Sequence, residues 1–352
     1  MIRAWLAAAA IGSAARGLWL SSPRVCNTRP RPAIEDLPMT TILYSHPACL
    51  EHDPGPHHPE SAARLRAVLT ALDDPEFTGL ERREAPEAAL DDLLRVHSRR
   101  HVERTLGAVP RSGHVGIDAD TILSPASGTA ALRAAGAVVA AVDAVVAKEA
   151  DNAFCAVRPP GHHAEPERAM GFCLLNNAAI GALRAREVHG LARVAVIDFD
   201  VHHGNGTQAA FESDGSLFYA STHQYPLYPG TGAANETGVG NIVNVPLRPM
   251  SGSGPFRLAM TQRILPALDA FRPNLVVVSA GFDAHRNDPL AQLLLEERDY
   301  AWVTDMLLEI AARHAERRFV ATLEGGYDLG ALGASVAAHV RALMSATGCP
   351  LL

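Results

Sequence analysis

The chain has 352 residues, which is long enough for one large α/β domain or two smaller ones. Its formal net charge of -7 at pH 7 argues against a dedicated nucleic-acid-binding protein, which is usually basic, so we expect no direct nucleic-acid binding. A cationic substrate, such as a lysine side chain or a polyamine, is compatible with this charge. The cysteines number 5 and lack CxxC or zinc-finger spacing, so we expect them to be reduced.

Residues 1–38 differ in composition from the rest, because arginines occur there without any acidic residue before Glu35. The apolar stretch over residues 4–11 is too short to cross a bilayer, and we expect no membrane segment. Three interpretations fit this segment: a signal peptide, an organellar transit peptide, or an extension ahead of a true start at Met39. In each case residues 1–38 are expected to be a disordered extension or a targeting segment. A cytoplasmic location is the first expectation, and organellar targeting is the alternative.

From Met39 onward, short apolar strands alternate with helical patterns. The expected strands are residues 41–44, 153–157, 194–199, 217–221, 275–279 and 319–323. The expected helices are residues 59–72, 126–150, 176–188, 256–271, 297–313 and 332–344. This alternation is typical of one α/β domain, here residues 39–352, with a central, mainly parallel sheet flanked by helices on both faces.

Polar motifs follow five of the expected strands. They are residues 158–163, 198–206, 221–223, 280–283 and 324–327. In open parallel sheets, ligands bind outside the carboxyl ends of the strands. The pattern therefore predicts one site built from all five segments.

A metal-binding pattern lies in two of these motifs. Asp200 and His202 are two residues apart, so on an extended backbone they point to the same side. With Asp283 they supply one nitrogen and two oxygen donors and leave an open coordination position, as catalytic zinc sites do. Each residue alone could be structural, but the neighbouring glycine-flanked histidines favour a metal site. Two carboxylates make a harder donor set than most zinc sites have, so Fe²⁺, Co²⁺ and Mn²⁺ are alternatives to Zn²⁺.

Two other motifs offer groups for catalysis. His162 and His163 follow a Pro-Pro-Gly sequence and titrate near neutral pH, which suits them to proton transfer. Gly325 and Gly326 permit a sharp turn that could bring the Tyr327 phenol over the metal. A phenol in that position can donate a hydrogen bond to a developing oxyanion.

Together these segments resemble the motif series of zinc-dependent histone deacetylases and acetylpolyamine amidohydrolases. The resemblance rests on RPPGHH (158–163), GFCLLNN (171–177), DFDVHHGNG (198–206), SAGFD (279–283) and LEGGY (323–327), in matching order over residues 41–345. It implies the arginase-deacetylase α/β fold and metal-dependent hydrolysis of an acylated amine. Asn205 stands where class I enzymes carry aspartate, which points to the class II branch.

The resemblance also implies roles for individual residues. The implied ligands of one Zn²⁺ ion are Asp200, His202 and Asp283. The implied catalytic residues are His163 as general base and then acid, His162 as its electrostatic partner oriented by Asp198, Asn205, and Tyr327 as oxyanion donor. The implied substrate channel is lined by Gly171, Phe172 and Tyr228, with Leu290 at its mouth. A structural K⁺ ion is implied near Asp198, Asp200, His202, Ser221 and Thr222, and a second cation near Phe211, Asp214, Leu217 and Asn241.

The first functional hypothesis is a class II-like deacetylase that acts on acyl-lysine or related acylated amines. The alternative is an acetylpolyamine amidohydrolase. Leu290 stands where polyamine-specific relatives carry an acidic residue and so favours acyl-lysine, although Asp118 and Asp120 could attract a cationic amine. Two other classes fit the sequence less well. A ureohydrolase would need a two-metal centre, and only one full ligand set is visible. A non-catalytic acyl-lysine-binding module would have no need of Tyr327. A homo-oligomer is compatible with the sequence.

Overall fold

A computed structural model of the protein describes residues 39–345, so the expectations for residues 1–38 lie outside the described part. The central strands are β1 Thr41–Ser45, β2 Glu81–Glu84, β5 Asn152–Cys155, β6 Val194–Asp198, β7 Leu217–Gln224, β8 Ile242–Leu247, β9 Leu275–Ala280 and β10 Phe319–Leu323. They form one sheet in the order β2-β1-β5-β10-β9-β6-β7-β8, and every adjacent pair is parallel. Two short strands, β3 Val115–Gly116 and β4 Ile122–Leu123, pair separately. The predicted α/β fold is confirmed.

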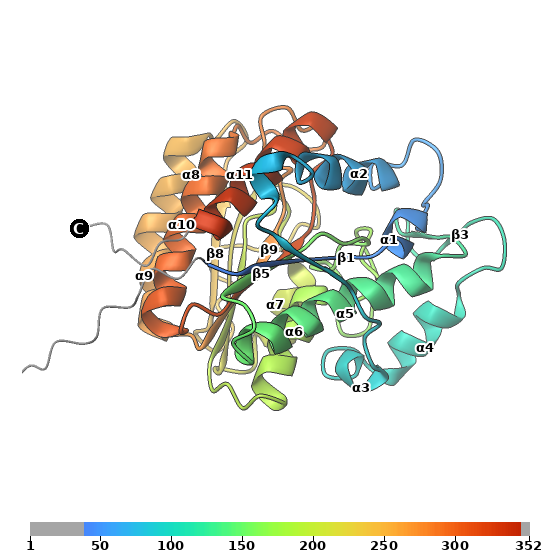
Figure 1. The fold of residues 1–352 in the computed structure, drawn as a ribbon, viewed down its shortest axis with the longest axis horizontal. Helices are drawn as coiled ribbons and strands as arrows, with labels where there is room; N and C mark the ends of the chain where they lie inside the picture. The colour runs from blue at the N-terminus through green and yellow to red at the C-terminus, as the bar shows by residue number, and fades with distance from the viewer. Residues whose placement is uncertain (1–38, 346–352) are drawn as a thin grey trace, which may run out of the picture. The chain divides into compact units, whose positions relative to one another are not determined.

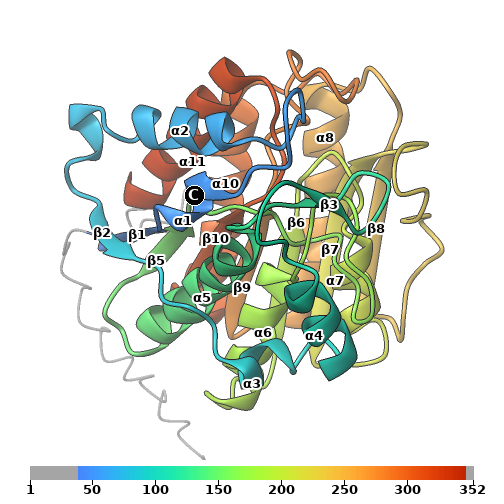
Figure 2. The same ribbon diagram turned by 90° about the vertical axis from the view of Figure 1, so that its right-hand side faces the viewer.

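Helices cover both faces of the sheet (Figures 1 and 2). One layer contains α5 (Ser127–Val146) and α6 (Asn177–Glu187), and the other contains α2 (Ala62–Ala71), α10 (Glu297–His314) and α11 (Leu329–Ser345). The shorter helices are α1 Ala48–Glu51, α3 Leu90–Leu93, α4 Arg99–Gly107, α7 Asn205–Phe211, α8 Ser253–Ala259 and α9 Leu265–Phe271. Because both faces are covered, β5, β6, β9 and β10 are buried at every residue, which explains their continuous apolar sequences.

Three predicted helices have different ends in the structure. The helix expected from residue 59 begins at Ala62, because Ser61 has extended backbone angles (φ -132°, ψ 160°). The long alanine-rich helix ends at Val146, and Lys148 beyond it is left-handed (φ 60°). The helix expected over residues 256–271 starts at Ser253 and contains a π-helical turn, Met260–Ile264, between α8 and α9.

Within residues 39–345, α5 is the helix long and apolar enough to cross a membrane by length and composition. Of its 18-residue apolar window, 67% is buried inside the domain. It packs against α6 on one side and β5 on the other. Its apolar residues therefore belong to the protein core.

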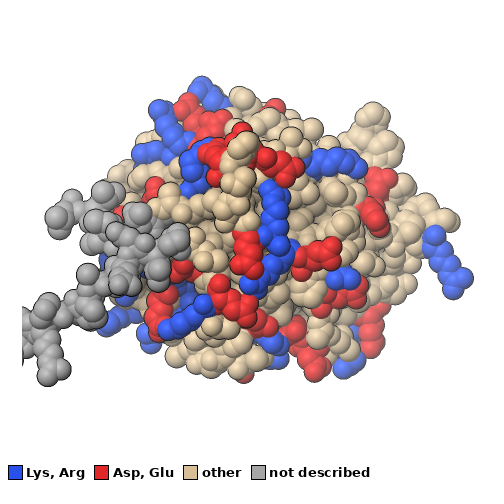
Figure 3. Space-filling model, viewed as in Figure 1, with Lys and Arg blue, Asp and Glu red and all other residues tan. Residues whose placement is uncertain are grey.

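Charges of both signs are mixed on the surface. On the face shown in Figure 3, acidic and basic side chains are interspersed, and the described residues there form no continuous basic surface. Some of the surface charges form ion pairs, such as Arg83 with Glu149 at 2.7 Å. Exposed pairs of this kind contribute about 1 kcal/mol or less each.

His339 in α11 determines part of the response of stability to acid. Its ring is fully buried, with its centroid 5.5 Å from that of Phe154, and Nδ1 lies 2.6 Å from the Thr304 hydroxyl. Burial lowers the pKa of His339 from 6.5 to about 3. The folded protein keeps this ring neutral while the unfolded chain protonates it below about pH 6.5, so stability is lost as the pH falls from there toward 3.

We expect the free energy of unfolding of the native chain to fall by about 2 kcal/mol more than that of His339→Gln between pH 7 and pH 5. Urea unfolding of both proteins at the two pH values measures this difference, because the other titrating groups are common to both. Equal losses would show that His339 takes up a proton in the folded state.

Candidate active site

The five polar motifs meet at the carboxyl edge of the sheet. Their strands β5, β10, β9, β6 and β7 are consecutive neighbours in it. The register places Asp198 at the end of β6 beside Ser279 of β9 and Ser221 of β7. Ser221 and Thr222 lie within β7, which runs to Gln224, and not after the strand as the sequence pattern predicted.

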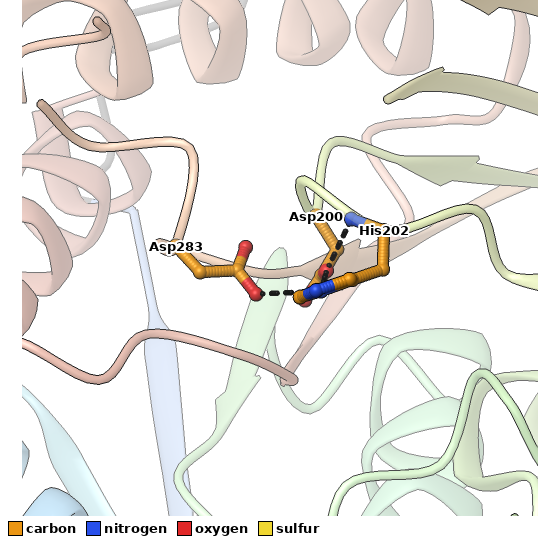
Figure 4. A group of neighbouring side chains, drawn as sticks. All are labelled: Asp200, His202 and Asp283. Atoms are coloured by element: carbon orange, nitrogen blue, oxygen red, sulfur yellow. Dashed lines mark hydrogen bonds and ion pairs between the residues drawn. The ribbon is translucent and has the colours of Figure 1, made fainter. Parts of the chain in front are cut away.

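The three predicted metal ligands lie together. Asp200 and His202 follow β6, Asp283 follows β9, and the side chains point toward one another from opposite sides (Figure 4). Their ligand atoms all lie within 4.8 Å of one another. His202 Nδ1 is 3.1 Å from both Asp200 Oδ1 and Asp283 Oδ2. The donors come from two strands adjacent in the sheet but distant in the sequence.

Backbone N–H groups orient the two carboxylates. The N–H of Val201 donates to Asp283 Oδ1 at 2.8 Å, and the N–H of His202 donates to Asp200 Oδ1 at 2.9 Å. The N–H of Gly325 donates to Asp200 Oδ2 at 2.8 Å. Such contacts fix the direction of each oxygen, as the partners of metal ligands do in known metal sites.

Two glycines leave room for the carboxylates. A Cβ atom at Gly281 would lie 2.1 Å from Asp200 Oδ2. A Cβ atom at Gly325 would lie 2.0 Å from Asp283 Oδ2 and 2.6 Å from Asp200 Oδ2. Any larger residue would displace the oxygens, so these positions are shaped around the donor cluster.

The electrostatics of the cluster favour a cation. Burial, followed by the nearby charge of Asp200, raises the pKa of Asp283 to about 7. Burial alone would lower the pKa of His202, but its hydrogen bonds to Asp200 and Asp283 raise that pKa to about 10. The same buried negative charge that attracts a proton attracts a metal ion, and a bound ion keeps His202 neutral and both carboxylates ionised. The donor set therefore fits a divalent metal.

The two histidines of the 158–163 motif lie beside this cluster. Their ring centroids are 4.0 Å apart, and the centroid of His163 is 5.9 Å from that of His202. Asp198 Oδ2 lies 2.9 Å from His162 Nδ1. Burial opposes a charge on both rings, yet the charges of Asp198 and Asp200 raise the pKa of His162 well above its usual value. Burial, and then the neighbouring His162, lower the pKa of His163 well below its usual value.

Asn205 sets the tautomer of His163. Its Oδ1 lies 2.9 Å from His163 Nδ1, and its Nδ2 donates to Glu165 Oε1 at 2.8 Å. Because Glu165 can only accept when ionised, the amide oxygen faces His163 and the proton sits on Nδ1. No hydrogen bond within residues 39–345 involves His163 Nε2, so this atom is an available acceptor on a ring whose centroid is 5.9 Å from that of His202.

Tyr327 is held by Asp288 at its backbone and by Arg64 at its ring. Its backbone N–H donates to Asp288 Oδ2 at 2.7 Å. The Arg64 guanidinium lies 4.8 Å from the ring centroid and donates to the carbonyls of Glu324 and Gly326, both at 2.5 Å. Burial raises the pKa of Tyr327 well above 10, so its hydroxyl remains a donor. None of the described residues hydrogen-bonds this hydroxyl.

The residues predicted for a substrate channel lie beside His163, Tyr327 or Asp288. Gly171 has φ 56°, and a Cβ atom there would lie 2.5 Å from His163 Cδ2. Phe172 lies 6.0 Å from Tyr327, and Tyr228 lies 5.1 Å from His163, both between ring centroids. Leu290 is 38% exposed, and its N–H donates to Asp288 Oδ1 at 2.9 Å, the carboxylate that also holds Tyr327. That these four residues line one entrance stays a prediction.

The residues implied for the first monovalent cation are also neighbours. Asp198 and Ser221 are paired in the β6–β7 register, and Thr222 follows in β7. Asp198, Asp200, Ser221 and Thr222 are buried, and His202 is 9% exposed. A buried carboxylate beside buried hydroxyls suits a hard cation.

Sequence reasoning missed the buried charges that support the site. Glu60 pairs with Arg158, which donates to it through Nε and, at 2.7 Å, through Nη2, and it also pairs with Arg64 at 3.1 Å. The Glu324 carboxylate accepts from the N–H groups of Gly161 at 2.7 Å and His162 at 3.2 Å. Burial raises the pKa of Glu324 to about 7. Arg158 and Glu324 lie inside motifs, but Glu60, the partner of Arg158, lies in none and is 98 positions away.

Comparison with known proteins agrees with this geometry. The chain matches a family described as "Histone deacetylase domain" over residues 58–343. It is 38% identical to "Histone deacetylase 14, chloroplastic" of Arabidopsis thaliana, over 89% of this chain and 79% of that protein. It is 40% identical to the "Histone deacetylase-like amidohydrolase" of Pseudomonas aeruginosa, over 82% of each protein.

A solved structure shows the same fold. The HD domain of HDA15 matches with a TM-score of 0.82 at 34% identity, covering 89% of this chain and 90% of that one. The family match spans both segments of the donor cluster and the Tyr327 motif. The chain therefore belongs to the histone deacetylase family, a family of deacetylases and amidohydrolases, as its motif series predicted.

Proposed function

We propose that this protein is a zinc-dependent hydrolase that removes acetyl or related acyl groups from lysine side chains. The observation that best supports the proposal is the three-donor cluster of Asp200, His202 and Asp283, with neutral His163 beside it. A divalent ion held by these donors would supply Lewis-acid polarisation of the amide carbonyl and a more acidic water. Zn²⁺, one per chain, is the proposed ion, with a structural K⁺ ion near Asp198.

The protein groups act as follows in this proposal. His163 Nε2 accepts a proton from the attacking water while Asn205 holds its other nitrogen in the donor state. The Tyr327 hydroxyl donates to the oxyanion that forms when the carbonyl is attacked. His163 then gives its proton to the amine as the C–N bond breaks, so the products are a carboxylate and a free amine. His162, paired with Asp198, contributes positive charge beside these steps.

The entrance favours an acyl-lysine over an acylated polyamine. Leu290 cannot pair with the distal ammonium group of a polyamine. Asp118 and Asp120 raise the pKa of Tyr228, after the larger effect of burial, and therefore lie near the entrance. These two aspartates would attract any cationic substrate. Leu290 is therefore the residue that distinguishes acyl-lysine substrates from acylated polyamines.

We expect acetyl-lysine peptides to have a higher kcat/KM than N-acetylputrescine with the zinc-loaded protein. Leu290→Glu should raise kcat/KM for N-acetylputrescine by about 2–5-fold, because an exposed ion pair contributes at most about 1 kcal/mol. Leu258→Glu, at an exposed leucine of α8, is the matched control and should leave kcat/KM unchanged for both substrates. If N-acetylputrescine is preferred tenfold or more by the native chain, the acyl-lysine assignment is wrong.

The same assay tests whether the protein is an enzyme at all. Release of the corresponding carboxylate from any acyl-lysine peptide supports the proposal. Tight peptide binding without turnover would instead indicate an acyl-lysine-binding module. For residues 1–38 we propose a targeting or extension segment ahead of the catalytic domain. The relative named as chloroplastic supports organellar targeting as the alternative to a cytoplasmic location.

A further inference from the structure

Three backbone carbonyls at one turn point to a single side chain. Phe211 ends α7, Leu217 begins β7, and Asp214 lies in the turn between them. Their oxygens lie 2.8, 2.7 and 3.0 Å, respectively, from Nδ2 of Asn241, the residue just before β8. Asn241 is 5% exposed, so these contacts are interior ones. The amide nitrogen occupies the position on which the three oxygens converge.

The orientation of the amide is determined by its other end. Asn241 Oδ1 accepts the N–H of Val239 at 3.2 Å. A flipped amide would place Oδ1 against three carbonyl oxygens. It would also leave the Val239 N–H facing Nδ2, which is itself a donor, so the nitrogen must face the carbonyls. An NH₂ group has two hydrogens and here meets three acceptors, so at least two carbonyls share a hydrogen.

The turn offers no free negative charge to an ion. The Asp214 carboxylate faces away, where it pairs with Arg186 and accepts from the N–H of Ser216 at 2.9 Å and from its hydroxyl at 2.7 Å. Only its backbone carbonyl joins Phe211 and Leu217. Converging carbonyls of this kind can replace the hydration shell of K⁺. The motif resemblance implies a second cation at this position. The position is taken by a neutral amide, so the residues present do not fit that cation.

We propose that the Asn241 amide replaces the second monovalent cation of this fold, so that the turn between α7 and β7 is complete without an ion. The turn lies directly after α7, whose first residue, Asn205, orients His163. The order of this part of the site would then be independent of the potassium concentration at that position. The inference does not depend on which acylated amine the protein hydrolyses.

Rubidium, which substitutes for potassium and scatters anomalously, tests the proposal directly. Crystals of the zinc-loaded full chain soaked in rubidium chloride should show no anomalous peak among the carbonyls of Phe211, Asp214 and Leu217. A peak at that position, with the Asn241 side chain displaced, would overturn the proposal. This measurement needs no variant.

A second test uses two neighbouring buried asparagines. Asn241→Ala leaves the three carbonyls without a donor, whereas Asn244→Ala in β8 removes bonds to Gln208 Oε1 (2.7 Å) and the Glu236 carbonyl (3.2 Å). When choline chloride in the buffer is replaced by potassium chloride at equal ionic strength, K⁺ can occupy the position that the amide has left. The Tm of Asn241→Ala should then rise by about 3 °C more than that of the native chain. Asn244→Ala should respond as the native chain does. An equal response of all three proteins would contradict the proposal.

Discussion

Gly325→Ala should abolish metal binding and hydrolysis, although it removes no metal ligand. The added Cβ would lie 2.0 Å from Asp283 Oδ2 and 2.6 Å from Asp200 Oδ2, closer than any real Cβ contact. Gly325 does not have a left-handed backbone, so alanine is compatible with the chain itself and the damage falls on the two carboxylates. We expect metal affinity to fall by more than the roughly 10–100-fold that losing a supporting contact costs, so that neither bound metal nor activity survives dialysis.

The matched control is Gly330→Ala, five positions along, in the first turn of α11. Its Cβ would meet only Asp328 Oδ1, at 3.5 Å, which is an ordinary contact. Metal per chain, measured by mass spectrometry after dialysis, should equal that of the native protein for Gly330→Ala and be near zero for Gly325→Ala. Circular dichroism of both variants should show an intact fold. Full metal content in Gly325→Ala would show that the donor cluster does not depend on this glycine.

Tyr327→Phe should lower kcat by about 10²–10³-fold, the usual effect of removing one oxyanion donor. The oxyanion exists only after attack on the carbonyl, so KM and metal content should change little. Phenylalanine keeps the ring that Arg64 contacts at 4.8 Å and the backbone N–H that binds Asp288. Steady-state kinetics on an acetyl-lysine peptide measure the change.

Tyr228→Phe is the control for the loss of a phenol at the same entrance. The centroid of its ring lies 5.1 Å from that of His163, and Tyr228 is 38% exposed. We predict that this side chain forms part of the channel wall. We expect this variant to keep kcat within a few-fold. If Tyr327→Phe also stays within a few-fold, the oxyanion donor is another group and Tyr327 is a packing residue.

Six of the eight strands of the sheet were predicted, because burial leaves a clear sequence pattern; the two edge strands, β2 and β8, were not. β9 and β10 are apolar at nearly every position and both faces of the sheet are covered. β2 was missed because it is Glu-Arg-Arg-Glu, an edge strand held by backbone pairing with β1 and not by apolar side chains. The extension of β7 from Thr222 to Gln224 was missed for a related reason, since hydroxyl and imidazole groups ended the apolar pattern.

The cluster of Asp200, His202 and Asp283 was predictable because each residue lies in a short motif at the end of a strand. The supporting residues were not, since their function depends on partners far along the chain. Glu60 pairs with Arg158 across 98 positions, and Arg64 reaches the Gly326 carbonyl across 262. The resemblance implied a second cation near Phe211, Asp214 and Leu217, and in the structure the carbonyls of these residues converge on the Asn241 amide. It could not show that Asn241 would turn its amide toward them, because that choice depends on the backbone of Val239.

Asp288 joins two functions that are usually considered separately. One oxygen holds the backbone of Leu290 at the entrance, and the other holds the backbone of Tyr327 at the reacting centre. Changing the side chain at position 290 leaves this link intact, but inserting or deleting a residue in the loop around it would shift the tyrosine as well. New substrate preferences in this protein should therefore arise by substitution at the entrance and not by changes of loop length.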